Sequence, residues 1–124
     1  MDVTEYIAAA NRESLVVCYC ETAQAVENID AIAAVDGLDV VFLGPWDLSQ
    51  SMGIIGQFDN PELRAAIDRV IDRTRAAGKA AGIISSSAAE ARQWFDRGAQ
   101  YVTISSDLGM MASQAKRFVC EIKG

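Results

Sequence analysis

Four short apolar runs, each followed by a stretch with helical periodicity, dominate this chain of 124 residues. The runs cover residues 15–20, 39–44, 80–84 and 101–105, and the helical stretches cover 22–35, 61–77, the segment between Ser87 and Gly98, and the residues from 107 onward. Strand–helix–strand units of this kind are parallel and right-handed. The pattern therefore predicts one α/β domain of four βα units over residues 1–124, in which residues 1–14 form a connector or a helical turn.

Two architectures accommodate four βα units. One is a small open parallel sheet with helices on both faces, and the other is half of an eight-stranded (β/α)₈ barrel. Periodicity alone does not choose between them. A half-barrel leaves its first and last strands unpaired and its apolar inner face open, so it is expected to associate with a partner.

Several local signals set the expected limits of the helices. Asn60 and Pro61 suit the N-cap and first position of the helix at 61–77, and the residues from Pro45 to Asn60 are predicted to form a long loop. Ser87 and Glu90 have the spacing of a capping box. The residues expected to pack from the four helices are Val26, Ile29, Ile32 and Ala33; Leu63, Ala66, Ile67, Val70 and Ile71; Ala91, Trp94 and Phe95; and Leu108, Met111, Ala112, Ala115, Phe118 and Ile122.

Composition excludes several classes of function. The net charge of −6 argues against a nucleic-acid or anionic membrane partner. No segment has the ~18 apolar residues of a membrane span, and the N-terminus does not resemble a signal peptide, so a cytoplasmic location is expected. The chain has no histidine, which rules out an imidazole base or ligand within it. Proton transfer would need a carboxylate, Tyr, Lys, metal-bound water or another chain.

Glu21 and Asp47 are the acidic residues with the clearest placement. Glu21 directly follows the first apolar run, and Asp47 comes three residues after the second. Because parallel strands end at the same edge of a sheet, both acids are expected at the edge where α/β proteins place their sites. Two converging carboxylates suit Mg²⁺ or Mn²⁺. The alternatives are a helix-capping or solvated role for Glu21, and a turn that Asp47 caps with Ser49.

The segment Gly44-Pro45-Trp46-Asp47-Leu48-Ser49, preceded by Gly37-Leu38-Asp39 and by Glu27-Asn28-Ile29-Asp30, is distinctive. With Glu21 ahead of it, and with the later segments Gly56–Glu62, Ala76–Gly82 and Ser106–Gly109, it resembles the HpcH/HpaI aldolase family, which includes the citrate lyase β-like proteins. This resemblance covers essentially the whole chain. It implies the second half of a (β/α)₈ barrel, strands five to eight, and metal-dependent class II aldol chemistry on 2-keto acids such as pyruvate.

The resemblance also implies roles for individual residues. Glu21 and Asp47 match the two metal-binding acids, for which Mg²⁺ or Mn²⁺ is expected, with Co²⁺ as a further candidate. Gly44, Pro45, Trp46 and Asp47 match the turn whose backbone amides, those of Trp46 and Asp47, receive the substrate carboxylate. Tyr19 departs from the family, which usually has Gln there, and should point the same way as Glu21.

Length is the larger departure from the family. The first half of the family barrel normally brings a catalytic histidine and an arginine, and neither has a counterpart here, so no catalytic residue is assigned. The sequence predicts a 2-keto acid aldolase (carbon–carbon lyase) that needs a complementary N-terminal half-barrel or self-association into a homo-oligomer. The alternative is a non-catalytic half-barrel that oligomerises and at most binds metal or small anions.

Overall fold

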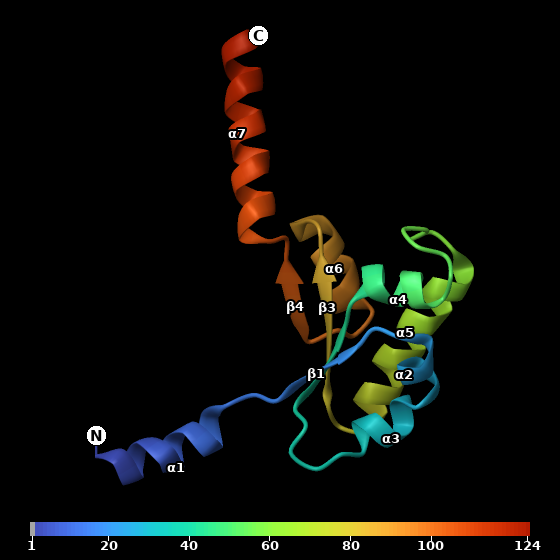
Figure 1. Ribbon diagram of the computed structural model, residues 1–124, viewed down its shortest axis with the longest axis vertical. Helices are drawn as coiled ribbons and strands as arrows, with labels where there is room; N and C mark the ends of the chain where they lie inside the picture. The colour runs from blue at the N-terminus through green and yellow to red at the C-terminus, as the bar shows by residue number, and fades with distance from the viewer. Residues whose placement is uncertain (1) are drawn as a thin grey trace.

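The computed structural model describes residues 2–124 and contains one parallel sheet of four strands (Figure 1). The strands are β1 (Val17–Cys20), β2 (Val40–Leu43), β3 (Ala80–Ser85) and β4 (Tyr101–Ile104). They lie side by side in chain order, and every neighbouring pair is parallel. The predicted series of four βα units is therefore confirmed, and all four strands end at the same edge of the sheet.

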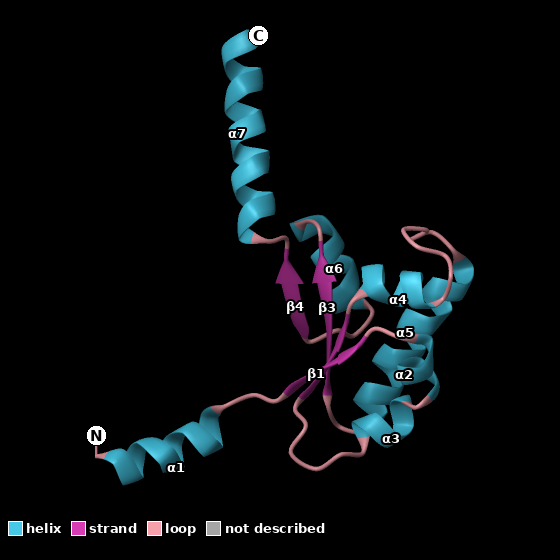
Figure 2. Cartoon of the chain, in the orientation of Figure 1, coloured by secondary structure: helices cyan, strands magenta, loops and turns pink. Residues whose placement is uncertain are grey.

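Seven helices are found in the described residues (Figure 2). They are α1 (Val3–Glu13), α2 (Ala23–Glu27), α3 (Ile29–Ala33), α4 (Pro45–Ser51), α5 (Pro61–Ala76), α6 (Ala88–Asp96) and α7 (Asp107–Lys123). Helices α2 to α6 gather on one side of the sheet, which excludes the architecture with helices on both faces (Figure 2). No helix among residues 2–124 is both long enough and apolar enough to cross a membrane.

The hydrophobic core lies between the sheet and helices α2 to α6. Strand β2 is buried along its whole length, as expected for a central strand of a parallel sheet. Helix α5 packs against this strand through the apolar residues that were predicted to pack, and two of them, Leu63 and Val70, are completely buried. Asn60 caps α5 as predicted, because its side-chain oxygen accepts a hydrogen bond from the Glu62 N–H at 2.9 Å.

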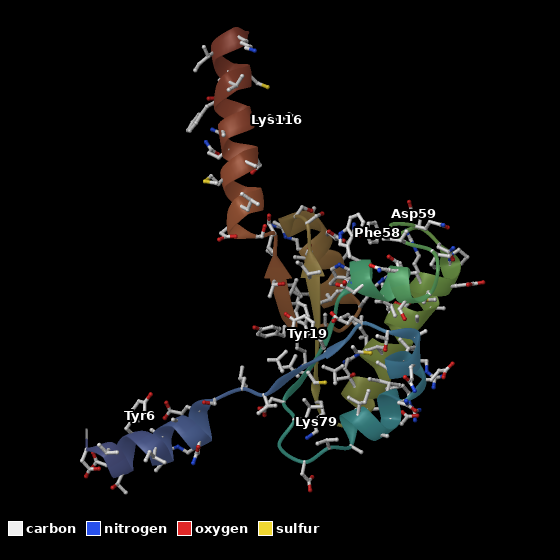
Figure 3. All side chains as sticks on the ribbon, in the orientation of Figure 1. Tyr6, Tyr19, Phe58, Asp59, Lys79 and Lys116 are labelled. Atoms are coloured by element: carbon white, nitrogen blue, oxygen red, sulfur yellow. The ribbon has the colours of Figure 1, made fainter. Side chains whose placement is uncertain are left out.

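The opposite face of the sheet carries a row of aromatic side chains. Tyr19, Phe42, Gly82 and Tyr101 are neighbours in the strand register. The Phe42 ring lies 5.1 Å from the Tyr19 ring and 5.9 Å from the Tyr101 ring, centroid to centroid. A Cβ atom at Gly82 would lie 2.8 Å from Phe42, so glycine makes room for this layer. Tyr19 stays 60% exposed, which leaves this face of the sheet open (Figure 3).

The two terminal helices project away from this body (Figure 1). The connector predicted for residues 1–14 contains a full helix, α1, which Asp2 caps with a complete capping box. Helix α7 has no buried residue, so the expected packing of Leu108, Met111 and Phe118 within the chain is wrong. Its apolar residues identify a face of the helix, but that face has no partner in the described part of the chain.

Two further differences concern the segments that carry the acids. The helix predicted at 22–35 is divided into α2 and α3 at Asn28, whose φ of −91° and ψ of 10° are not helical. The loop predicted from Pro45 to Asn60 begins with helix α4 instead. Its sequence starts with Gly-Pro, which suits a turn, but proline also fits the first position of a helix because no hydrogen-bond donor is needed there.

Candidate functional site

Glu21 and Asp47 occupy the ends of adjacent strands, as the sequence predicted. Glu21 directly follows β1, and the next residue, Thr22, is the N-cap of α2. Asp47 lies in the first turn of α4, for which Gly44 is the N-cap. Thr22 rather than Glu21 therefore caps α2, and Ser49 bonds to the Trp46 carbonyl rather than to Asp47. Neither carboxylate has a hydrogen-bond donor among residues 2–124, so both are available to a ligand.

Gly44 shows how closely the two carboxylates converge. A Cβ atom at this position would lie 2.9 Å from Glu21 Oε2 and 3.5 Å from Asp47 Oδ2. Both oxygens thus flank the same side of the Gly44 backbone. The backbone angles of Gly44, φ −105° and ψ 90°, are open to any residue, so the glycine is needed here for space and not for its conformational freedom.

All the predicted site residues line one hollow of about 330 Å³ on the open face of the sheet. Five of its lining residues directly follow the ends of β1 and β2: Glu21, Gly44, Pro45, Trp46 and Asp47. Its floor comes from the strands and includes the aromatic layer, and the remaining lining residues are Val17, Tyr19, Phe42, Ile84, Tyr101 and Thr103. Tyr19 therefore points to the same side as Glu21, as its two-residue spacing predicted.

The two acids fit a hard divalent cation. No cluster of three or more His, Cys, Asp or Glu side chains is found in residues 2–124, so Glu21 and Asp47 are a pair without a further side-chain ligand of these types. Mg²⁺ is commonly held by one or two carboxylates and completes its shell with water and substrate oxygens. The hollow of about 330 Å³ beside the two acids leaves room for such ligands.

The first turn of α4 is held in place by the loop that follows it. The Trp46 ring is 61% exposed and packs edge-on against Phe58, with centroids 4.7 Å apart. Figure 3 shows Phe58 beside Asp59 on that loop. The backbone N–H groups of Trp46 and Asp47 have no acceptor within residues 2–124, as is usual for the first turn of a helix. They are therefore free to bind an anion.

Ser49, which the sequence suggested only as a partner of Asp47 in a turn, has a different role in the structure. It is completely buried. Its hydroxyl donates to the Trp46 carbonyl oxygen at 2.7 Å and accepts from the Gly56 N–H at 3.1 Å. One side chain thereby joins the turn that carries Asp47 to the loop that braces Trp46. Only its position two residues after Asp47 could have suggested this.

Ser49→Ala is expected to lower the free energy of unfolding by about 1–3 kcal/mol, because it leaves the Gly56 N–H without its acceptor. Urea denaturation followed by circular dichroism measures this change. Ser113→Ala is the matched control, since Ser113 lies on the exposed helix α7 and should change stability by less than about 0.5 kcal/mol. An equal effect of the two substitutions would contradict the role given to Ser49.

Glu90 forms a second polar cluster at the same edge of the sheet. Its carboxylate accepts hydrogen bonds from the Ser86 N–H and the Ser86 hydroxyl, both at 2.7 Å, and from the Ser85 hydroxyl at 3.2 Å. The predicted capping box is thus only half formed: Ser87 accepts from the Glu90 N–H, but the Glu90 carboxylate bonds to Ser86 and not to Ser87. Partial burial raises the pKa of Glu90, but the bonds from Ser86 and Ser85 outweigh it and hold the pKa below its ordinary value.

This lowered pKa makes stability depend on pH. The unfolded chain takes up the Glu90 proton at a higher pH than the folded chain, so the stabilisation is present above about pH 4.3 and is lost as the pH falls through the folded-state pKa. Glu90→Gln is expected to be less stable than the parent at pH 7, with the difference shrinking on acidification. Urea midpoints from pH 7 to pH 3 measure it, with Glu27→Gln, a substitution of the same type on the exposed surface, as the matched control.

Comparison with known proteins places this chain in a family. The model of the HpcH/HpaI aldolase/citrate lyase family matches residues 2–114. The 5-keto-4-deoxy-D-glucarate aldolase of Enterobacter sp. (strain 638) is 36% identical over 121 residues, which are 98% of this chain and 47% of the relative. The chain spans about half the length of the curated relatives it matches.

Solved structures agree with this comparison. An HpcH/HpaI aldolase from Desulfitobacterium hafniense DCB-2 matches 99% of this chain and 48% of its own length, with a TM-score of 0.88 and 32% identity. An HpcH/HpaI aldolase/citrate lyase family protein from Burkholderia cenocepacia J2315 matches 97% of this chain and 47% of its own length, with a TM-score of 0.90 and 32% identity. The four βα units thus correspond to about half of these aldolase folds. The chain belongs to the HpcH/HpaI aldolase/citrate lyase family.

Proposed function

We propose that this chain is the metal- and keto-acid-binding half of a class II aldolase that uses pyruvate as its enolate donor or product. The observation that carries the proposal is the convergence of Glu21 Oε2 and Asp47 Oδ2 over Gly44. Glu21 and Asp47 would hold Mg²⁺ or Mn²⁺, with Co²⁺ as a further candidate. When bound, the cation supplies positive charge next to the oxyanion that develops on a 2-keto acid.

The chain's own residues bind and orient the keto acid. Gly44 lets a ligand approach the backbone closely, and Pro45 fixes the start of α4. The N–H groups of Trp46 and Asp47 then point toward the carboxylate of the bound acid. The hydrogen bonds of Ser49 join this turn to the loop that follows α4, and the contact with the Phe58 ring limits the movement of Trp46.

The histidine and arginine that the family's first half supplies would come from elsewhere. The chain has no histidine, and within residues 2–124 the hollow that holds Glu21 and Asp47 is lined by no lysine or arginine. A complementary N-terminal half-barrel, or a second copy of this chain, would cover the open aromatic face and supply the missing groups. The chain's span of about half its relatives' length supports this requirement. We place the assembled enzyme in the cytoplasm.

Calorimetric titration with Mn²⁺ in the presence of oxalate tests the proposal, because oxalate mimics the enolate of pyruvate. We expect binding in the micromolar range, and none when Mn²⁺ is omitted, since Glu21 and Asp47 would hold the cation and the cation would supply the positive charge that attracts oxalate.

Absence of binding would contradict the proposal and would favour the alternative, a non-catalytic half-barrel. Sedimentation velocity on the same sample distinguishes a monomer from a homo-oligomer. A monomer that binds Mn²⁺ and oxalate would point to a complementary half as the partner.

A further inference from the structure

A second hollow of about 480 Å³ adjoins the site of Glu21 and Asp47. Pro45, Trp46 and Ile84 line both hollows, so these three residues form the boundary between them. A molecule held beside Asp47 can therefore extend past the Trp46 side chain into the second hollow. The lining beyond this boundary comes from the ends of β3 and β4, from α6 and from the loop after α4: Phe58, Ser85, Ser86, Glu90, Ser105 and Ser106.

Hydroxyl groups dominate the polar part of this second hollow. Ser85 and Ser86 donate their protons to atoms of the chain, the Ser87 carbonyl and the Glu90 carboxylate, so toward a ligand they present acceptor lone pairs. Ser106 already accepts from the Gly109 N–H. The Ser105 hydroxyl has no hydrogen-bond partner within residues 2–124 and can both donate and accept.

Ser105 is held in an unusual conformation. Its φ of 60° is positive, the only such value for a non-glycine residue in the described chain. The Ser105 N–H donates to the Ser85 carbonyl at 2.8 Å, which joins the ends of β3 and β4. Positive φ values are uncommon outside glycine and often mark functional positions.

The charge in this hollow is negative. Glu90 is its one charged lining residue, and no lysine or arginine lines it within residues 2–124. The N-terminal ends of α6 and α7, which carry partial positive charge, already have acidic residues beside them. Glu90 accepts a hydrogen bond from the Ser86 N–H at the start of α6, and Asp107 lies in the first turn of α7. Two arginines of the neighbouring hollow, Arg64 and Arg97, are paired with Asp59 and Asp68.

We propose that the second hollow binds the part of the substrate beyond the 2-keto acid group, and that it selects an uncharged, hydroxyl-bearing chain over one that ends in a carboxylate. The inference rests on the proposed function, because the keto acid end must be held at Glu21 and Asp47. Substrate hydroxyls would donate to Ser86 and Glu90 and exchange a hydrogen bond with Ser105. A terminal carboxylate would face Glu90, and the two arginines of the adjoining hollow that Glu90 also lines, Arg64 and Arg97, already have acidic partners.

Two six-carbon acids make a matched pair of probes. 2-Keto-3-deoxygluconate ends in an uncharged CH₂OH group, and 5-keto-4-deoxyglucarate ends in a carboxylate, while both carry the same keto acid group. Each is titrated into the Mn²⁺-loaded chain, with pyruvate and oxalate as references. We expect the gluconate derivative to bind about tenfold more tightly than pyruvate, and more tightly than the glucarate derivative, since one or two added hydrogen bonds have that effect.

Two variants test the residues. Ser105→Gly suits the positive φ and removes the hydroxyl, so it should reduce the affinity for the gluconate derivative toward that of pyruvate and leave oxalate binding unchanged. Glu90→Gln should reduce the difference in affinity between the two six-carbon acids, and it should leave the affinity for oxalate unchanged.

The outcomes separate the two proposals. If oxalate binds but the gluconate derivative binds no better than pyruvate, or no better than the glucarate derivative, the second-hollow proposal is overturned and the metal site stands. If oxalate does not bind in the presence of Mn²⁺, the proposed function fails and this inference fails with it.

Discussion

Asp47→Asn is expected to weaken Mn²⁺ binding, measured with oxalate present, by about 100-fold. The substitution keeps the shape of the side chain but removes the charge of one of the two proposed carboxylate ligands, so the loss should reach the upper end of the 10- to 100-fold range seen when an outer partner of a ligand is removed. The fold should be unaffected, because Asp47 is exposed and its side chain makes no hydrogen bond within residues 2–124.

Asp36→Asn is the matched control for this substitution. Asp36 is also an exposed acid, on the turn before β2, and lies apart from the hollow. Its replacement removes the same charge from the chain and should leave Mn²⁺ affinity unchanged. A similar loss in both variants would mean that the net charge of the chain, and not a site at Asp47, determines metal binding.

Gly44→Ala is expected to weaken Mn²⁺ binding about 10- to 100-fold through a single added methyl group. The backbone angles of Gly44 suit alanine, so the strand and α4 should remain in place. The new Cβ, however, would lie 2.9 Å from Glu21 Oε2, so the Glu21 carboxylate must shift from its position beside Asp47. Calorimetry measures the loss, and far-ultraviolet circular dichroism confirms that the secondary structure is retained.

Glu21→Gln provides the comparison for Gly44→Ala. It removes the charge of the same carboxylate without adding any atom at Gly44. The two variants should bind Mn²⁺ with similarly reduced affinity if both act through Glu21. Parent-like binding by Gly44→Ala would show that the two carboxylates do not need to meet over the Gly44 backbone.

The order of the elements and most of the core could be predicted from periodicity. The stripe of α5 and the buried strand β2 followed from the spacing of apolar residues alone, because both are enclosed within this chain. Helix α7 shows the limit of that reasoning. Its stripe is equally regular, but periodicity identifies an apolar face without identifying what covers it.

The placement of the two acids was predictable for a topological reason. Parallel strands joined by helices must end at one edge, so residues directly after β1 and β2 had to meet there. Helix α4 was missed because Gly44-Pro45 is compatible with both a turn and a helix start. The role of Ser49 was not predicted because its partners are backbone atoms of residues 46 and 56 rather than Asp47, and no pattern of side chains reveals them.

Strand order that matches chain order has a consequence for folding kinetics. Every strand pairs with the strand next to it in sequence, so no pairing requires closure of a loop longer than one βα unit. Each pairing still joins residues far apart in sequence, such as Val40 and Ala80, and parallel pairing over such separations is associated with slower folding than helical contacts are. The unit β2–α5–β3 has the most complete burial and should form the folding nucleus, to which β1 and β4 add from either side. A sheet that grows by such local additions also keeps both edge strands ready to accept a neighbour after folding is complete.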